Sequence, residues 1–240
     1  MKKSVLILAL LGAAASAHAQ TPNIRGPWTE VNVTNPISAA PGYRIEDVST
    51  VSADVAWALA REDNAGSKSE YFFRTSNTAG TDFAFDQITA SGSVSTYNAS
   101  NIAAVSATTA FVSRYGATGG GEILRTTNSG ASWTLQTAPS DFTAGGGFLD
   151  FVYMFDANVG VAVGDPTNGY FEIRRTTDGG TTWNRIASQP ALIPNTAEAG
   201  LTGSYFGLGN TIWFGGATLD DARQERVFKS TDRGVTWTVS

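Results

Sequence analysis

The 240-residue chain has no cysteine, and its one histidine, His18, lies close to the N-terminus. The part of the chain that follows His18 therefore has neither cysteine nor histidine. This excludes disulfide frameworks, Ser–His–Asp triads and soft-metal sites there. Lysine is scarce, no basic stripe is present, and the formal net charge is −5. Nucleic acid and anionic membrane surfaces are therefore poor candidates for partners, because both favour clustered lysine and arginine.

Long apolar runs are also missing after residue 19, so we expect no membrane span. Residues 1–19 have the pattern of a secretory signal peptide. Two lysines precede an apolar run from Val5 to Ala15, which is shorter than the roughly 20 residues of a span, and a small-residue cleavage site follows at 17–19. We expect a secreted, periplasmic or cell-surface bacterial protein whose mature part is residues 20–240, with no metal and no cofactor.

Glycine, threonine, serine and aromatic residues are abundant, and no apolar pattern with a helical period is sustained, which indicates an all-β fold. Within this composition the stretch "RTTDGGTTWNRI" recurs as "RTTNSGASWTLQ" and "KSTDRGVTWTVS". Each copy has an acidic or amide residue, then a glycine two residues later and a tryptophan five residues later. The three sets are Asn128, Gly130 and Trp133; Asp178, Gly180 and Trp183; and Asp232, Gly234 and Trp237.

A degenerate copy around Asn77 extends the series, and the four copies are 51, 50 and 54 residues apart. Each is preceded by a strand–turn–strand pattern such as "VYMFDANVGVAVG" and by a third short strand such as "FEIRRT". A fourth short strand follows each tryptophan. A repeated unit of four antiparallel strands and about 40 to 55 residues predicts a β-propeller blade. An immunoglobulin-like sandwich would not repeat one motif at a constant period.

The recurring motif resembles the Asp-box, or BNR repeat, with the pattern Ser/Thr-x-Asp-x-Gly-x-x-Trp. The resemblance implies a hairpin corner. In such a corner the acidic or amide side chain accepts hydrogen bonds from loop N–H groups, the glycine permits a positive φ, and the tryptophan is buried between strands. A calcium loop needs more oxygen ligands than each copy offers, and a phosphate loop needs a lysine and a helix. We therefore expect a structural role for the motif.

About four repeats are present, whereas the family that the motif resembles has six to eight blades. A stray strand-like segment, Trp28–Val31, precedes the first repeat. We therefore expect an incomplete ring truncated at the C-terminus, with further copies of the motif in longer downstream sequence; an unusual small propeller is the alternative. Open sheet edges would be a liability in solution.

Asp-box propellers include sialidases, and "YRIEDV" faintly resembles their arginine motif, with Arg44 in the arginine position. A single arginine cannot form the cluster that binds a substrate carboxylate, and no tyrosine–glutamate pair can be assigned. Propellers that hydrolyse xyloglucan use two carboxylates, for which Asp150 and Asp165 are the candidates. We assign no catalytic residue and keep a sialidase or xyloglucanase-type glycoside hydrolase as the alternative.

The stretch "VGVAVGDPTNGYFEIRRTTDGGTTW" is similar to the photosystem II assembly-factor-like propellers and their exported bacterial relatives, which implies a binding or scaffold role. We predict a noncatalytic module that recognises a protein or a glycan; an architectural repeat in a larger surface protein is a third possibility. Loops between the second and third strands of each unit are the expected ligand loops, because binding residues concentrate on loops of a rigid scaffold. Their candidate residues are Arg61, Asp63, Arg114, Tyr115, Asp165, Asn168, Asp220 and Asp221.

Overall fold

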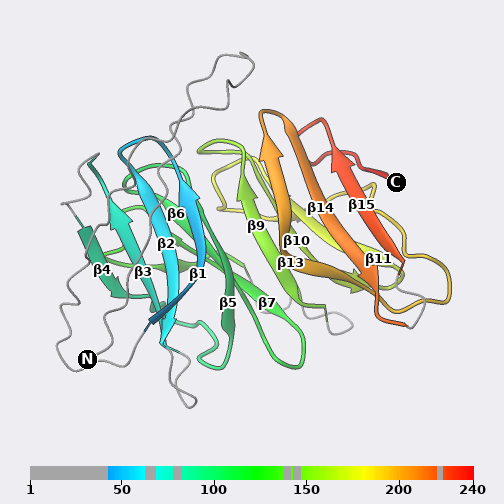
Figure 1. Ribbon diagram of the computed structural model, residues 1–240, viewed down its shortest axis with the longest axis horizontal. Helices are drawn as coiled ribbons and strands as arrows, with labels where there is room; N and C mark the ends of the chain where they lie inside the picture. The colour runs from blue at the N-terminus through cyan, green and yellow to red at the C-terminus, as the bar shows by residue number, and fades with distance from the viewer. Residues whose placement is uncertain (1–42, 63–68, 78–82, 138–141, 143–146, 221–223) are drawn as a thin grey trace, which may run out of the picture.

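The computed structural model describes residues 43–62, 69–77, 83–137, 142, 147–220 and 224–240 (Figure 1). These residues form four antiparallel sheets of four strands each, and no helix occurs among them. The all-β class and the four-stranded repeat are therefore confirmed. The predicted signal peptide and the strand-like segment Trp28–Val31 lie outside the described residues.

The strands follow the predicted repeat, one sheet per unit. Sheet 1 contains β1 (Tyr43–Thr50), β2 (Ala56–Glu62), β3 (Glu70–Thr75) and β4 (Phe83–Gln87). Sheet 2 contains β5 (Asn98–Ala104), β6 (Ala110–Tyr115), β7 (Gly121–Thr126) and β8 (Thr134–Leu135). Sheet 3 contains β9 (Leu149–Met154), β10 (Gly160–Thr167), β11 (Tyr170–Thr176) and β12 (Asn184–Arg185). Sheet 4 contains β13 (Glu198–Leu208), β14 (Thr211–Thr218), β15 (Glu225–Ser230) and β16 (Thr238–Val239).

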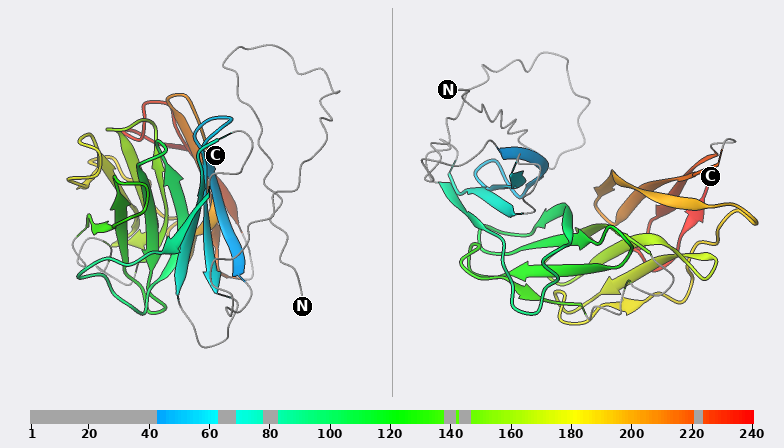
Figure 2. Two further views of the ribbon diagram at one scale, coloured as in Figure 1. Left: turned by 90° about the vertical axis from the view of Figure 1, so that its left-hand side faces the viewer. Right: turned by 90° about the horizontal axis from the view of Figure 1, so that it is seen from below.

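Within each sheet the strands pair in chain order, and the sheets follow one another along an open arc (Figure 2). The first strands β1, β5, β9 and β13 contact each other in series and line the inner side of the arc. This radial arrangement of unclosed sheets is the one expected for consecutive blades of a propeller.

Apolar side chains fill the three spaces between consecutive sheets. Between sheets 1 and 2, Trp57 and Phe72 pack with Ile102, Val112 and Leu124. Corresponding clusters lie between sheets 2 and 3 and between sheets 3 and 4. Sheets 2 and 3 lie between other sheets and are buried on both faces. Their strands therefore have nearly continuous apolar sequences instead of alternating apolar and polar residues. Each fully buried side chain of this size stabilises the fold by about 1.5–3 kcal/mol.

Side chains also join the first strands of neighbouring sheets. Asp47 in β1 accepts a hydrogen bond from the N–H of Ile102 in β5 at 2.9 Å. One sheet further, Asn101 in β5 binds Val152 in β9 through both the N–H and the C=O, at 2.9 and 2.8 Å. These polar side chains link first strands that belong to different sheets and do not pair with one another.

Several residues expected in the ligand loops lie in strands: Arg61 in β2, Arg114 and Tyr115 in β6, and Asp165 in β10. The expectation of loop positions is wrong for these four residues, because strand pairing continues further than the sequence pattern predicts. The pairs that extend it include Arg61 with Glu70 and Arg114 with Glu122.

Candidate functional site

The corner between the third and fourth strands has one hydrogen-bond pattern in sheets 2, 3 and 4. In sheet 3, the buried Thr176 hydroxyl accepts the N–H of Gly180 at 2.8 Å and donates to Asp178 at 2.8 Å. Asp178 also accepts the N–H and the hydroxyl of Thr182, at 2.9 and 2.7 Å. The same hydroxyl and amide contacts recur at Thr126, Asn128 and Gly130 in sheet 2 and at Ser230, Asp232 and Gly234 in sheet 4.

Each corner glycine has a positive φ and lies against the preceding sheet. Gly180 has a φ of 85°, and a Cβ on it would lie 2.6 Å from the ring of Phe111 in sheet 2. The other two corners make the corresponding contact, with Gly130 against Phe72 and Gly234 against Val161. Only a residue without a side chain fits such a position.

The corner tryptophans lie against the hydrophobic core. Trp133 and Trp183 are buried, and Trp237 packs edge-on against Phe214 with ring centroids 5.2 Å apart. Hydrogen bonds from Thr182 lower the pKa of Asp178, whose carboxylate binds its own loop. In this geometry the acidic or amide side chain of each corner binds its own loop, and the corner glycine contacts the preceding sheet.

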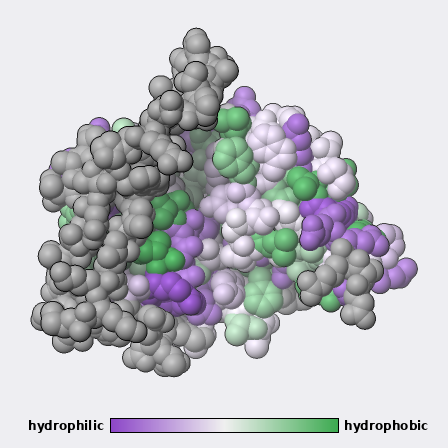
Figure 3. All heavy atoms as spheres, viewed as in Figure 1, coloured by the Kyte–Doolittle hydropathy of each residue, from purple (hydrophilic) through white to green (hydrophobic). Residues whose placement is uncertain are grey.

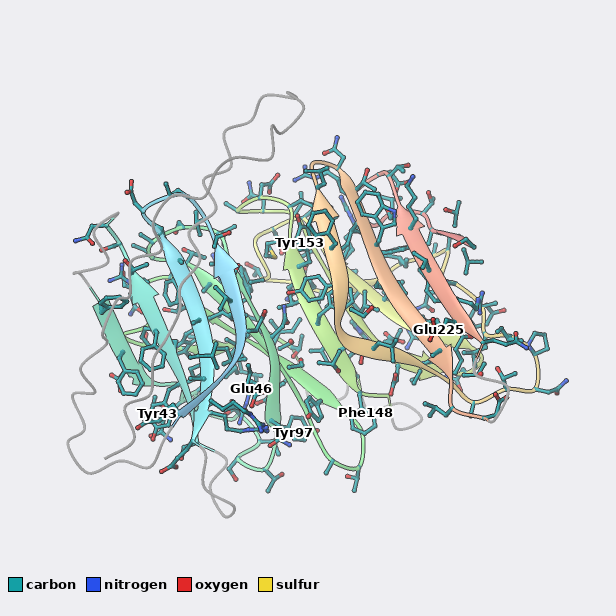
Figure 4. All side chains as sticks on the ribbon, in the orientation of Figure 1. Tyr43, Glu46, Tyr97, Phe148, Tyr153 and Glu225 are labelled. Carbon is teal, nitrogen blue, oxygen red and sulfur yellow. The ribbon has the colours of Figure 1, made fainter. Side chains whose placement is uncertain are left out.

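The second strands end and the third strands begin at the opposite end of the sheets, which is the lower edge of Figure 4. We call this end the turn face. Tyr43 and Glu46 mark its position on β1 in the figure. Here Arg44 and Arg61 both bind Glu46, at 2.7 and 3.0 Å. Arg44, the residue compared with the sialidase arginine motif, thus shares one carboxylate with Arg61.

A pocket of about 400 Å³ opens on the turn face between sheets 1 and 2. Its walls come from the start of β3, the end of β4, the segment that leads to β5, and the end of β6. The lining is mostly polar: Ser69, Glu70, Gln87, Ile88, Thr89, Ala90, Ser93, Ser95 and Arg114. Five of these nine side chains carry a neutral hydroxyl or amide group. The pocket therefore offers both hydrogen-bond donors and acceptors.

A buried ion-pair network forms the inner wall of this pocket. Arg114 donates from Nε to Glu70 at 2.8 Å and from Nη1 to Glu122 at 2.5 Å, and all three side chains are buried. Its Nη2 donates to the carbonyl oxygen of Tyr97 at 3.1 Å. Burial raises the pKa of Glu70 to about 7, although Arg114 acts in the opposite direction. Arg114, which is predicted from the sequence to lie in a loop, thus links sheets 1 and 2 through a buried ion pair with Glu70.

Asp150 and Asp165, the candidate hydrolase carboxylates, meet at the backbone of Gly200 in sheet 4. The Gly200 N–H donates to Asp165 at 2.8 Å, and a Cβ on Gly200 would lie 2.0 Å from Asp150 Oδ2. Asp150 is only 3% exposed, and Thr202 contacts its other oxygen at 3.4 Å. Burial, followed by repulsion from Asp165, raises the pKa of Asp150, and burial also raises that of Asp165.

The remaining candidates are dispersed over the turn face. Tyr115 packs against Phe148, with ring centroids 5.7 Å apart. Asn168 adopts a φ of 54° in the β10–β11 turn, and Asp220 accepts the hydroxyl of Thr218 at 2.7 Å. Two candidates, Asp63 and Asp221, lie outside the described residues.

Glu70 and Glu122 are not among the residues predicted from the sequence, although a signal for them exists. A glutamate opens or nearly opens the third strand of every unit, in "EYFFRT", "EILRT", "FEIRRT" and "ERVFKS". In sheet 3 the corresponding Glu172 is buried and binds Arg174 and Arg185. A recurring glutamate in a strand with two buried faces indicates a buried ion pair.

Across the described part of the chain, no helix has the length and apolar character to cross a membrane. Within the same residues, no group of three or more histidine, cysteine, aspartate or glutamate side chains is arranged to hold a metal ion.

No family model matches the chain, and no curated protein matches it. Solved structures similar to it include a mutant of Trypanosoma rangeli sialidase displaying trans-sialidase activity, at 13% identity and a TM-score of 0.53. That match covers 99% of this chain and 42% of the other. Trypanosoma rangeli sialidase itself has 12% identity and a TM-score of 0.52, over 89% of this chain and 39% of the other.

A third similar structure is the SapL1 lectin in complex with alpha methyl fucoside, with 15% identity and a TM-score of 0.50. That match covers 84% of this chain and 63% of the lectin. The chain spans less than two thirds of each of these proteins. At such identities the likeness shows the fold alone: these proteins are β-propellers, and this chain has the β-propeller fold with unclosed sheets.

Proposed function

We propose that the chain is a noncatalytic β-propeller module that recognises glycans, and that the pocket between sheets 1 and 2 is its binding site. The supporting observation is the polar lining of that pocket at a volume of about 400 Å³. Small-ligand sites commonly have volumes of about 300–1,000 Å³.

The chemistry of the pocket suits a sugar. Each sugar hydroxyl both donates and accepts hydrogen bonds, and the hydroxyls of Thr89 and Ser95 and the amide of Gln87 can do the same. All three residues are exposed, whereas Glu70 and Arg114 behind them are buried and paired. A wall fixed in this way reduces the ordering cost of binding.

The fold comparison adds support, because a lectin complexed with a fucoside shares this architecture. We further propose that the module is exported, through the signal peptide at residues 1–19, and acts in the periplasm, at the cell surface or outside the cell. Finding an unprocessed N-terminus on protein recovered from a native host would contradict the export proposal.

A glycoside hydrolase is the second candidate, since Asp150 and Asp165 lie together on the turn face with raised pKa values. A general acid must reach the glycosidic oxygen. Asp150 instead lies against the backbone of Gly200 and is only 3% exposed. This burial favours the binding function.

One experiment distinguishes glycan binding from glycoside hydrolysis. Residues 20–240 are labelled and applied to a glycan array, and eluted glycans are analysed for cleavage. We expect retention of intact glycans. Release of sugar from sialosides or β-glucans that Asp165→Asn abolishes would replace the binding function with hydrolysis. Absence of retention on the array would favour a protein ligand.

A further inference from the structure

The wall of the pocket between sheets 1 and 2 contains more carboxyl groups than cations. Two buried carboxyls, Glu70 and Glu122, share the guanidinium of Arg114, at 2.8 and 2.5 Å. The backbone N–H of Ala99 also donates to Glu70, and that of Val94 donates to Glu122 at 3.1 Å. Each carboxyl oxygen thus accepts a hydrogen bond, whereas one of the two negative charges has no cation of its own. Burial of such a charge is costly.

The other buried glutamates of the described residues have at least one cation each. In sheet 3, Glu172 binds two arginines, Arg174 and Arg185. In sheet 4, Glu198 binds Arg226 at 2.7 Å. The shortage of cations is therefore specific to the one network of buried glutamates that lines the pocket.

Arginines beside this network are paired outside the pocket. Arg61 is opposite Glu70 in the β2–β3 register, but its guanidinium binds Glu46 at 3.0 Å. Arg44 binds the same carboxyl at 2.7 Å. Figure 3 shows hydrophilic residues in the part of the surface where Figure 4 labels Glu46. Neither arginine belongs to the pocket lining, so neither supplies the missing cation to its wall.

The pKa of Glu70 reflects the same shortage. Burial raises this pKa to about 7, and Glu122 raises it as well, although Arg114 acts in the opposite direction. A further cation on the pocket side of Glu70 would stabilise its charged form. An ammonium group suits this position, because it has three donors, and the exposed hydroxyls of Thr89 and Ser95 can accept hydrogen bonds from it.

We propose that the pocket prefers glycans with an ammonium group, as in amino sugars, to neutral glycans, and neutral glycans to carboxylated ones. This preference rests on the proposed glycan recognition and adds a charge class to it. Arg114, the cation of the lining, already donates to two carboxyls and to the Tyr97 carbonyl oxygen. A sugar carboxylate would therefore face Glu70 without a free cation, and such disfavoured contacts contribute to specificity.

Three glucans test the preference on a constant backbone. Cellotetraose, the β-1,4-linked glucosamine tetramer and the β-1,4-linked glucuronate tetramer differ in a hydroxyl, ammonium or carboxylate group on each sugar. On an array at neutral pH and physiological ionic strength, residues 20–240 should retain the glucosamine tetramer at least about fivefold better than cellotetraose. The glucuronate tetramer should be retained least. Tetralysine, which has ammonium groups but no sugar hydroxyls, should not displace the glucosamine tetramer.

Two variants test the role of Glu70. Glu70→Gln leaves Arg114 paired with Glu122 alone, so the ratio of glucosamine-tetramer to cellotetraose retention should fall to about one. Asp86→Asn removes an exposed carboxylate outside the lining and should leave this ratio unchanged. The comparison among the three glucans uses the unaltered protein, so it decides the preference even if Glu70→Gln folds poorly.

The outcomes separate the preference from glycan recognition itself. Retention of cellotetraose equal to that of the glucosamine tetramer, best retention of the glucuronate tetramer, or retention of other neutral glycans alone would overturn the preference while recognition stands. Displacement by tetralysine would also overturn it, because it would show a general attraction of cations to a protein of net charge −5. Retention of no glycan at all would contradict the proposed function, and the preference with it.

Discussion

Gly180 in the corner of sheet 3 lies directly against Phe111 in sheet 2, so that a Cβ on the glycine would be 2.6 Å from a ring carbon. Corresponding contacts recur in the corners of sheets 2 and 4, each with the preceding sheet. The recurring motif therefore forms a contact between consecutive sheets as well as a turn within one sheet. Because the motif recurs about every 50 residues, one such contact forms in each of sheets 2, 3 and 4.

Replacing that glycine should separate packing from backbone strain. Gly180→Ala combines a positive φ with the clash against Phe111, so we expect a loss of about 3 kcal/mol or more in unfolding free energy. Gly169→Ala is the control, because Gly169 also has a positive φ but no atom within 4 Å of the added Cβ. It should cost about 1 kcal/mol. Equal losses of unfolding free energy for the two variants, measured by urea denaturation, would contradict a close contact between Gly180 and Phe111.

The corner hydroxyl should matter more than its exposed neighbour. Thr176→Val leaves the buried N–H of Gly180 without its acceptor, which should cost about 1–3 kcal/mol. Thr181→Val removes an exposed hydroxyl that donates to the Asp178 carbonyl, and it should change stability by less than about 0.5 kcal/mol. Thermal unfolding of both variants compares the two positions. A smaller loss of stability for Thr176→Val than for Thr181→Val would refute a stabilising role of the Thr176 hydroxyl.

The buried arginine should be essential to folding near the pocket. Arg114→Met leaves the carboxyls of Glu70 and Glu122 buried without their cation, which should cost about 3–5 kcal/mol. The loss should be larger at pH 8 than at pH 5, because the pKa of Glu70 is about 7 and protonation relieves part of the unpaired charge. Urea unfolding at the two pH values measures this difference. A pH-independent loss would show that Arg114 acts mainly through packing.

Stability should have a maximum at mildly acidic pH. The folded pKa of Glu70, about 7, lies above its ordinary value of 4.5, so the folded state binds more protons between these values. Stability from this group is present below pH 4.5 and is lost as pH rises through 7, by about 3 kcal/mol. The raised pKa of Asp150 acts in the same direction.

At lower pH the dependence of stability on pH has the opposite sign. Hydrogen bonds from its own loop hold the pKa of Asp232 at about 2, although burial opposes them, so stability from this group is lost as pH falls below about 4. Melting temperatures from pH 3 to pH 8 should therefore peak near pH 4–5. Asp150→Asn should raise the melting temperature at pH 7 and change it little at pH 4.5. A steady rise in stability up to pH 8 would contradict the raised pKa values.

The sequence predicted the features that depend on neighbours along the chain. The recurring motif, the hairpins and the strand "EYFFRT" all carry local signals, and β3 spans Glu70–Thr75 as that stretch predicts. Turn residues and strand periodicity determine such elements within about ten residues. The fold class followed from their repetition, which requires no knowledge of contacts between sheets.

The site depended on contacts that the sequence pattern does not specify. Arg114 meets Glu70 from 44 residues away, and Gly200 meets Asp165 across 35 residues. Its turn-rich surroundings made Arg114 a plausible loop residue, whereas its partners on the neighbouring strand and sheet place it in a buried strand end. The pocket arises only where sheets 1 and 2 meet, so no single motif marks it.

Blocking the pocket while leaving the network behind it intact is the most direct test of glycan recognition. Ser95→Trp places a large side chain on the exposed rim, and Ala131→Trp places the same side chain on the exposed corner of sheet 2, at the other end of the sheets. Retention on the glycan array should fall at least tenfold for Ser95→Trp and stay unchanged for Ala131→Trp. Equal retention of both variants would show that glycans bind elsewhere, and would contradict the proposed site.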